Sequence, residues 1–301
     1  MTRPGTAPRS SRFRAVVPKK DGPRRGRRFL ALPNLAVRLA EACYGAGMLQ
    51  IDLSGKVVLL TGASGQLGRV MARTLAACGA DMILHYFTDT ASIERVKRDV
   101  EALGRRVVDV QADVSCEPGV RTISEKAEET LGMPDIVIIN AVQQIHPWSV
   151  VTEESIEDYE SQFRTCVLQT VLLAKAFTPA LRAKGWGRII GINTECSMQM
   201  FETYSAYVAG KRGMDGVLRV LAREIGQYGI TVNQVAPGWT LSERDQTKPA
   251  DDAKYRENVP LRRRGTDQEV ANVVAFLASN LSSFVHGAFV PVCGGNVMPA
   301  I

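Results

Sequence analysis

The chain has 301 residues, of which 45% are hydrophobic and 23% charged; this balance is typical of a globular protein and excludes a largely disordered one. No stretch approaches the 18 consecutive apolar residues of a membrane-spanning helix. The net charge of +6 is unevenly distributed, because residues 1–47 hold eleven basic and two acidic residues while residues 48–301 hold 26 and 29. The basic character belongs to the N-terminal segment, so the globular part gives no reason to expect a nucleic-acid partner.

Six cysteines are scattered along the chain without a CxxC pair, and only three histidines accompany them. This spacing excludes a zinc module, and we expect no metal site. A disulfide framework is also disfavoured, so we expect reduced thiols and a cytoplasmic location.

Residues 1–47 are rich in proline, glycine and arginine and show almost no early apolar periodicity. Such a segment cannot bury enough apolar surface to offset chain entropy, so we expect disorder to about residue 28 and a short amphipathic helix over residues 29–43. Three interpretations remain open: a reading frame begun too far upstream, a targeting segment, or an interaction tail. Met48 opens a natural domain start, which predicts an extension over 1–47 and a domain over 48–301.

From Lys56 onward, short apolar runs alternate with helical patterns, which is typical of a doubly wound parallel sheet. The expected strands cover residues 57–61, 82–86, 106–111, 136–140, 188–192, 231–235 and 288–292. The expected helices cover residues 66–78, 91–103, 118–131, 155–183, 204–228 and 267–279. The last helix follows a capping box at Thr266 and Glu269 and carries an apolar stripe. The sequence therefore predicts a single Rossmann-type α/β domain, a seven-stranded parallel sheet with helices on both faces.

A glycine-rich turn, Thr61-Gly62-Ala63-Ser64-Gly65-Gln66-Leu67-Gly68, follows the first strand and opens a helix. In this context glycines let the backbone approach a pyrophosphate, whose charge meets the amide donors at the positive end of the helix. The alternative is a strand-to-helix turn that binds nothing. We expect six of its residues to bind a dinucleotide: Gly62, Ser64, Gly65, Gln66, Leu67 and Gly68.

The end of the second strand bears on the type of nucleotide, because an NAD site usually places a carboxylate there for the ribose 2′-hydroxyl. Tyr86 ends that strand, and Asp89 lies further into the loop. The missing acid favours NADP, although no arginine stands there to hold a 2′-phosphate, and NAD remains the alternative.

Three more residues lie at the carboxyl edge of the sheet, where ligands of this fold gather. Asp113 and Val114 follow the third strand, and Asn140 ends the fourth. We expect all three to bind the cofactor; a solvated loop position is the alternative for Asp113.

Tyr207 and Lys211 lie four residues apart in a predicted helix, so their side chains share one face. Thr194 ends the preceding strand, thirteen residues before Tyr207. A threonine hydroxyl can hold a substrate carbonyl while a phenol donates a proton to it. A nearby ammonium favours phenolate, so we expect Lys211 to draw the pKa of Tyr207 down from about 10; it can also reach the nicotinamide ribose. The three residues together predict proton transfer to a carbonyl oxygen.

With these motifs the chain resembles the short-chain dehydrogenase/reductase family, in the single-domain branch typified by 3-oxoacyl-acyl-carrier-protein reductases. The resemblance runs from about Leu53 to Met298 and includes the runs Gly187-Arg188-Ile189-Ile190, Ile230-Thr231-Val232-Asn233-Gln234-Val235-Ala236-Pro237-Gly238 and Cys293-Gly294-Gly295. It implies NAD(P)-linked reduction of a carbonyl or oxidation of an alcohol, in a homotetramer built partly through two long helices. It also implies that Pro237, Gly238 and Thr240 line the nicotinamide side, with Ser242 a second candidate.

The chain departs from the family's pattern at several positions. The central glycine of the turn falls on Gln66, and Val142 replaces a glycine that permits close approach. The catalytic serine is Thr194, which keeps the hydroxyl. The family's helix asparagine, which holds a proton-relay water, aligns with Cys166. We include Cys166 in the catalytic set but expect a straighter helix and slower proton transfer there, because cysteine is a weak hydrogen-bonding group.

These features predict an NAD(P)-dependent oxidoreductase that transfers a hydride between nicotinamide and a small-molecule carbonyl or alcohol, with no nucleic-acid or membrane partner. A 3-oxoacyl thioester or a similar ketone fits as substrate. The loops over residues 142–152 and 241–259, with Trp148, Trp239 and Tyr255, are the expected substrate walls. The alternative is a catalytically decayed nucleotide-binding scaffold or regulator, which the departures favour and the intact tyrosine and lysine oppose.

Overall fold

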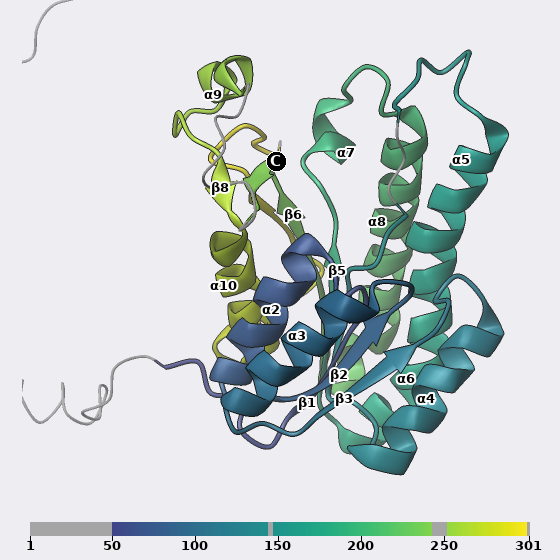
Figure 1. Cartoon of the computed structure of the whole chain (residues 1–301), viewed down its shortest axis with the longest axis vertical. Helices are drawn as coiled ribbons and strands as arrows, with labels where there is room; N and C mark the ends of the chain where they lie inside the picture. The colour runs from purple at the N-terminus through teal and green to yellow at the C-terminus, as the bar shows by residue number, and fades with distance from the viewer. Residues whose placement is uncertain (1–49, 144–146, 243–251, 300–301) are drawn as a thin grey trace, which may run out of the picture. The chain divides into compact units, whose positions relative to one another are not determined.

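The structure, a computed structural model, describes residues 50–143, 147–242 and 252–299. The expected disorder to about residue 28 and the helix over residues 29–43 lie outside the described residues. From Gln50 onward the chain alternates strands and helices (Figure 1), as the apolar pattern predicts.

Seven strands form one sheet in the order β3-β2-β1-β4-β5-β6-β9, and every neighbouring pair is parallel. The strands are β1 (Val57–Leu60), β2 (Asp81–Tyr86), β3 (Val107–Gln111), β4 (Ile136–Ile139), β5 (Gly187–Ile192), β6 (Ile230–Pro237) and β9 (Phe289–Val292). The predicted fold class is confirmed, and each expected strand is present within two residues of its expected bounds.

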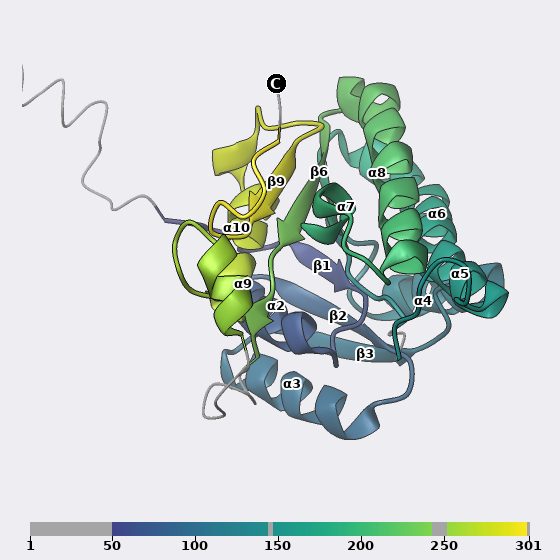
Figure 2. The same cartoon turned by 90° about the horizontal axis from the view of Figure 1, so that it is seen from above.

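Helices cover both faces of this sheet (Figure 2). One face carries α2 (Gln66–Ala77), α3 (Thr90–Ala102) and α10 (Asp267–Ala278). The other face carries α4 (Glu117–Thr130), α5 (Ile156–Gln162), α6 (Gln169–Lys184) and α8 (Ser205–Ile225). The resulting three layers are those of a doubly wound domain.

The strands are mainly apolar because both faces of the sheet are largely buried. Leu60 packs into the core beneath α2 and α10, whereas its neighbour Leu59 packs into the core beneath α4, α6 and α8. Both side chains are fully buried. Burial of a leucine is worth about 1.5–3 kcal/mol, so each strand contributes to two hydrophobic cores at once.

The predicted capping box at the start of α10 is confirmed. The Thr266 hydroxyl accepts the Glu269 N–H at 3.2 Å, and the Glu269 carboxylate accepts the Thr266 N–H at 2.8 Å. Arg263 bonds the same carboxylate and, with the Thr266 N–H, lowers the pKa of Glu269 to about 2. The expected stripe is buried at Val270 and Leu277, which seat α10 on the sheet.

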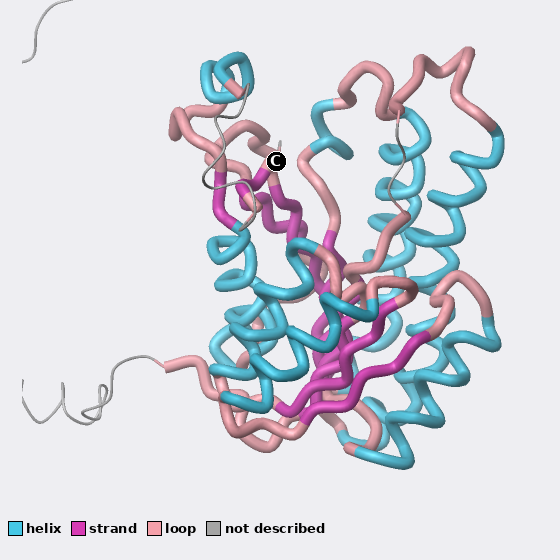
Figure 3. Tube along the Cα trace, in the orientation of Figure 1, coloured by secondary structure: helices cyan, strands magenta, loops and turns pink. Residues whose placement is uncertain are grey.

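Four short elements were not predicted: α7 (Cys196–Gln199), α9 (Ala253–Asn258), and the strands β7 (Thr240–Leu241) and β8 (Gly265–Thr266). They have two to six residues, too few for a periodic pattern to register. Figure 3 shows both short helices beyond the carboxyl ends of the strands. Within the described residues, no helix combines the length and apolar character that crossing a membrane requires.

Candidate active site

The residues predicted to bind a cofactor lie along the carboxyl edge of the sheet, and the glycine turn and Asn140 meet at the point where β1 and β4 are neighbours. Chain order runs from β1 to β3 on one side of this point and from β4 to β9 on the other. The connections diverge there, and open α/β sheets bind ligands at such a point, beyond the carboxyl ends of the strands.

The glycine turn between β1 and α2 brings backbone close to backbone. Gly62 has a φ of +65°, and a Cβ there would lie 2.9 Å from Cα of Ala141. A Cβ on Gly68 would overlap the Gly62 carbonyl oxygen. Gly65 caps α2 without a side-chain acceptor, which leaves the positive end of the helix to an external anion. This cradle fits the pyrophosphate of a dinucleotide.

A buried hydrogen-bond network holds the glycine turn against the loop that follows β4. The Thr61 hydroxyl donates to Gln169 Oε1 at 2.8 Å and accepts the N–H groups of Asn140 and Ala141 at 2.9 and 3.0 Å. Asn140 Nδ2 in turn donates to the carbonyls of Thr61 and Gly62 at 2.9 and 3.1 Å. Asn140 therefore shapes the turn, in addition to its predicted place at the cofactor edge.

His85, on β2, is a positioning residue that sequence reasoning missed. Its Nδ1 accepts the Gly62 N–H at 3.1 Å, and its Nε2 lies 3.0 Å from the Ala112 carbonyl, so Nε2 carries the proton of a neutral ring. The side chain is buried, and desolvation lowers the pKa of His85 to about 4. Only the β2 register, set by tertiary pairing, places this histidine beneath the turn.

Gln66 stands where the family has a glycine, and its side chain forms a bridge. Its Nε2 donates to Asp267 Oδ1 at 2.9 Å and to Thr240 Oγ1 at 3.3 Å. Asp267 begins α10, and Thr240 follows β6 on the predicted nicotinamide side. The departure at position 66 therefore connects the glycine turn to the loop after β6, which no pattern in the sequence indicated.

The remaining cofactor residues occupy the expected edge. Val114 is buried, and Asp113 is exposed, its carboxylate accepting the Ser115 N–H at 2.8 Å. Pro237 ends β6, and a Cβ on Gly238 would lie 3.0 Å from Cα of Cys293. Their contacts with a cofactor remain predictions.

The structure brings the three predicted catalytic residues together. Tyr207 lies in the first turn of α8, with its phenol beside the side chain of Thr194, which follows β5. Lys211, one turn further along α8, is buried; its Nζ donates to the Ile192 carbonyl at 2.7 Å and lies 5.8 Å from the centre of the Tyr207 ring. A phenol, a hydroxyl and an ammonium therefore converge at the carboxyl end of β5.

The expected direction of the Tyr207 pKa shift is wrong. Burial raises the pKa of this phenol above its usual value, because desolvation disfavours the phenolate. Burial also lowers the pKa of Lys211, which weakens the charge expected to act on the phenol. In the protein alone, Tyr207 is thus held as a neutral proton donor.

Asn193, which precedes Thr194, orients the catalytic loop and was also missed. Its Nδ2 donates to Gln234 Oε1 at 2.8 Å and to the Lys211 carbonyl at 3.1 Å, while its Oδ1 accepts the Thr194 N–H at 2.9 Å. This buried amide connects β5, β6 and α8, and it restricts the backbone that carries the Thr194 hydroxyl.

Cys166 lies in a π-helical segment, Phe163–Leu168, that joins α5 to α6 without a break. The expectation of a straighter helix is therefore wrong, since a widened turn is present with cysteine in place. Threonines bond the backbone on both sides: the Thr165 hydroxyl donates to a carbonyl one turn earlier, and the Thr170 hydroxyl donates to the Cys166 carbonyl, both at 2.7 Å. Burial raises the pKa of the Cys166 thiol, while the charge of Lys211 opposes this rise.

Glu195, directly after Thr194, joins three separate segments at the site and was missed as well. It is only 2% exposed; Tyr255 Oη donates to its Oε1 at 2.9 Å, and Asn296 Nδ2 donates to its Oε2 at 3.0 Å. The Trp239 N–H donates to the same Tyr255 oxygen at 2.9 Å. Burial raises the pKa of Glu195, and these hydrogen bonds oppose the rise.

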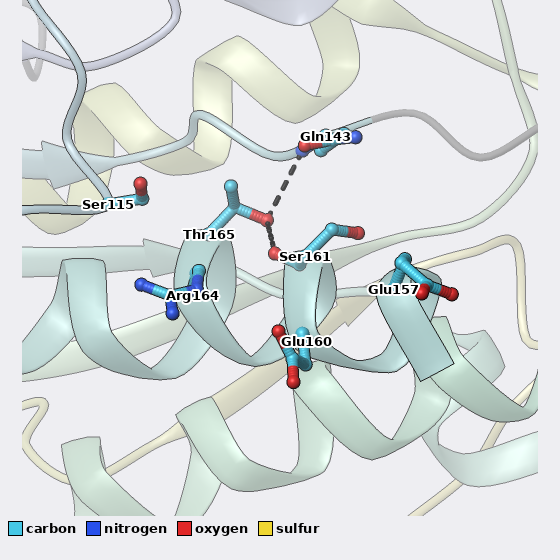
Figure 4. Close-up of a pocket in the computed structure, with 7 residues that line it drawn as sticks. All are labelled: Ser115, Gln143, Glu157, Glu160, Ser161, Arg164 and Thr165. Atoms are coloured by element: carbon cyan, nitrogen blue, oxygen red, sulfur yellow. Dashed lines mark hydrogen bonds between the residues drawn. The ribbon is translucent and has the colours of Figure 1, made fainter. Parts of the chain in front are cut away.

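An open cavity of about 190 Å³ lies between the loops after β3 and β4 and one face of α5 and the π-helical segment (Figure 4). Its lining is polar and consists of Ser115, Gln143, Glu157, Glu160, Ser161, Arg164 and Thr165. Since none of the predicted catalytic side chains lines it, we assign the chemistry to the carboxyl end of β5 instead.

Comparison with known proteins identifies the family. A family model described as enoyl-(acyl carrier protein) reductase matches residues 62–296. The chain is 34% identical over 251 residues to a 3-oxoacyl-acyl-carrier-protein reductase of Pseudomonas aeruginosa, covering 82% of this chain and 100% of that protein. It is 30% identical over 259 residues to an NADPH-dependent aldehyde reductase-like chloroplastic protein of Arabidopsis thaliana, covering 82% and 96%. The solved L-sorbose reductase of Gluconobacter frateurii, complexed with NADPH and L-sorbose, matches with a TM-score of 0.75 and 26% identity, covering 84% and 100%.

The chain therefore belongs to the short-chain dehydrogenase/reductase family, as the resemblance implied. It is an oxidoreductase that uses a nicotinamide cofactor and transfers a hydride between that cofactor and a carbonyl or alcohol group.

Proposed function

We propose that the chain reduces a ketone, with Tyr207 as the proton donor, Thr194 as the group that orients the carbonyl, and Lys211 as the charge that stabilises the phenolate formed. The observation that carries the proposal is the convergence of the Tyr207 phenol, the Thr194 side chain and the buried Lys211 ammonium at the end of β5. The names of the relatives, which include reductases of oxoacyl and aldehyde substrates, support the direction.

When bound, the nicotinamide supplies the hydride. The chain's own residues perform the proton transfer: Tyr207 gives its hydroxyl proton to the carbonyl oxygen as charge develops there. The Lys211 ammonium, fixed by the Ile192 carbonyl, then stands near the resulting phenolate. Before a substrate binds, the raised pKa of Tyr207 keeps the proton on its hydroxyl.

We propose that the cofactor is NADP rather than NAD. In the described loop after β2, the first acid is Asp89, and its carboxylate accepts the Ser92 N–H at 2.9 Å as the cap of α3. An acid committed to a helix cap is a poor partner for a ribose 2′-hydroxyl. Calorimetric titration is expected to give tighter binding of NADP⁺ than of NAD⁺, and equal or reversed affinities would contradict the assignment.

We propose a homotetramer in the cytoplasm. Exposed apolar side chains lie on two separate parts of the chain: Phe163 and Val220 on the long helices, and Phe276 and Phe284 near the C-terminus. Two self-complementary surfaces generate a tetramer of three perpendicular two-fold axes. Light scattering measures the mass directly, and a cytoplasmic location matches the enzyme's need for the cell's nicotinamide pool.

The alternative, a decayed scaffold that binds the nucleotide without turnover, rests on the departures at Gln66, Val142 and Cys166. A screen of cofactor oxidation over ketones, aldehydes, quinones and 3-oxoacyl thioesters, with both cofactors, tests the two. On the best substrate, Tyr207→Phe is expected to lower kcat by about 10²–10⁴-fold with nearly unchanged cofactor affinity. Turnover retained in that variant would remove Tyr207 from the mechanism, and the absence of turnover in the wild type would favour the scaffold.

A further inference from the structure

Three aromatic side chains that the mechanism does not use form a series of ring contacts that begins beside Tyr207. Trp148, from the loop between β4 and α5, stacks on Tyr204 with ring centres 4.4 Å apart and planes 13° apart. The same indole lies 5.8 Å from the Tyr207 ring at a tilt of 59°. Phe201 adds a third ring, 6.0 Å from Tyr204. We call Trp148, Tyr204 and Phe201 the aromatic wall.

The backbone holds the aromatic wall in an unusual conformation. Tyr204 directly precedes α8, so it lies one turn before Tyr207 and on the same side of the helix. In the preceding loop, Met200 and Thr203 have φ values of 58° and 68°, a left-handed region that residues with a Cβ seldom adopt. Such conformations cluster at ligand sites, because the contacts they create must compensate for them.

A second exposed ring flanks Thr194 from the other side. Because β5 lies between β4 and β6, the loops that carry Trp148 and Trp239 approach the end of β5 from opposite directions. Trp239 is 48% exposed and is fixed by an edge contact with Tyr255 at 5.5 Å and by the Arg264 guanidinium 4.1 Å above its ring. The aromatic wall on one side and Trp239 on the other therefore both present rings that contacts within the chain hold before a ligand binds.

Glu202, between Phe201 and Tyr204 in the chain, is exposed, whereas the two charged groups beside Trp239 are buried and bonded to other parts of the chain. Both carboxylate oxygens of Glu195 accept hydrogen bonds from protein donors, and the side chain is buried. Arg264 is also buried, between Trp239 and Asp252. What the walls offer a ligand is ring surface, which attracts a flat apolar molecule more than a polyol or a flexible acyl chain.

Building on the proposed ketone reduction, we propose that the substrate is an aryl ketone, a ketone whose carbonyl carbon is attached to a planar aromatic ring, and that Trp148 and Tyr204 select it by stacking. The carbonyl carbon gains the hydride, the C=O π bond opens, and the oxygen takes the Tyr207 proton. The ketone becomes a secondary alcohol while the nicotinamide is oxidised, so electrons and protons balance.

The test compares two ketones of the same carbon skeleton, 2-acetylnaphthalene and 2-acetyldecalin, of which only the first has flat rings. Fructose and the N-acetylcysteamine thioester of 3-oxobutanoate represent the polyol and acyl classes. The full chain is assayed with saturating NADPH. We expect kcat/KM for the naphthyl ketone to exceed that for the decalin ketone by about fivefold to tenfold, the value of an aromatic contact beyond its area.

Variants test whether the preference for the naphthyl ketone arises from the aromatic wall. Trp148→Leu and Tyr204→Leu keep an apolar side chain but remove the ring, and each is expected to lower the ratio of the two kcat/KM values to about twofold or less. Tyr228→Leu is the matched control: Tyr228 precedes β6, at the edge of the sheet opposite the site, and its ring packs on Arg182, so the ratio should equal that of the wild type. Circular dichroism and melting temperature confirm that each variant is folded.

Three results would overturn the inference: no aryl preference in the wild type, a preference retained in both wall variants, or faster turnover of fructose or the thioester. Failure of the proposed function gives a different result, namely no turnover of any carbonyl. In that case calorimetric binding of 2-acetylnaphthalene to the NADP⁺ complex still decides the point: weaker binding in Trp148→Leu, but not in Tyr228→Leu, supports the aromatic wall, and equal binding rejects it.

Discussion

The cofactor side of this site is formed mainly by backbone atoms, whereas the substrate side is formed by large side chains. Around the glycine turn, backbone meets backbone: Gly62 and Gly68 leave no room for a Cβ, and buried hydrogen bonds from Thr61 fix the arrangement. Around the end of β5, large side chains from distant segments, such as Trp239 and Tyr255, create the surface. The first side keeps the family's glycine-rich turn, apart from the departures at Gln66 and Val142, because a pyrophosphate needs one backbone shape. The rings of the second side follow no such pattern, because substrates differ.

The largest effect should come from filling the backbone cradle. Gly68→Ala places a methyl group against the Gly62 carbonyl oxygen, so we expect a loss of more than about 3 kcal/mol of unfolding free energy and of measurable cofactor binding. Gly216→Ala, on α8 where a Cβ meets nothing within 4 Å, is the control and should be neutral or stabilising by up to about 1 kcal/mol. Denaturant unfolding and NADP⁺ titration measure both; similar losses in the two variants would contradict a specific cradle.

The next effect is acid sensitivity on the cofactor side. The pKa of His85 is about 4 in the folded chain against 6.5 in the unfolded one, so the folded state binds fewer protons. Stability is therefore complete above pH 6.5 and is lost as the pH falls toward 4, by up to about 3 kcal/mol. His85→Asn keeps an acceptor for the Gly62 N–H and cannot be protonated, so its loss over this range should be smaller.

His286 supplies the control for this measurement. Its ring also bonds a backbone N–H, that of Val232, and a carbonyl, that of Ala222, but it is exposed. His286→Asn makes the same substitution at an exposed ring and leaves the buried ring of His85 in place. An acid profile of His85→Asn that matches the wild type across pH 4–7 would show that another group governs acid unfolding.

On the substrate side, Glu195→Gln should have a smaller effect. A glutamine amide directed at Asn296 Nδ2 sets donor against donor, which costs about 1–2 kcal/mol. Because burial raises the pKa of Glu195, the wild type loses stability as the pH rises through that pKa, and the variant has no such titration. The difference between the two melting temperatures should therefore narrow from pH 5 to pH 9; a widening gap would mean that the ionised carboxylate is the stabilising form. Tyr255→Phe removes both the donor to Glu195 and the acceptor of the Trp239 N–H, and it should raise KM for the ketone and leave cofactor affinity unchanged.

A still smaller effect is expected for Cys166→Asn. Since the π-helical turn already exists and the Thr170 hydroxyl already bonds the Cys166 carbonyl, asparagine has no bend left to create. We expect kcat to change by less than about twofold, with the same solvent deuterium effect across pH 6–9. A rise of fivefold or more with a smaller isotope effect would show that proton relay through this turn limits the native enzyme.

The smallest effect is expected from removing residues 1–47. This segment shows no core-forming periodicity, and the first described strand begins at Val57. Melting temperature, oligomer mass and activity should equal those of the full chain. A change in oligomer mass would indicate an interaction tail.

Much of the fold could be predicted because its signals are local. The strands are continuous apolar runs, and the turn between β1 and α2 carries glycines where backbone crowding demands them. Tyr207 and Lys211 were recognisable from their helical spacing together with Thr194 at the end of the preceding strand. The π-helical turn at Cys166 was not, because the threonine bonds that accompany it depend on how α5 and α6 pack against α8.

The sequence by itself determined the doubly wound parallel sheet, the glycine turn after β1 and the grouping of Thr194, Tyr207 and Lys211, since each rests on residues close together in the chain or on a rule of parallel sheets. The tertiary structure alone decided which other side chains hold the glycine turn and the catalytic loop in position. Glu195 meets Asn296 across 101 residues, and His85 meets Gly62 through strand pairing. It also set the direction of the Tyr207 pKa shift, because desolvation depends on what covers the phenol, and no spacing of residues specifies that.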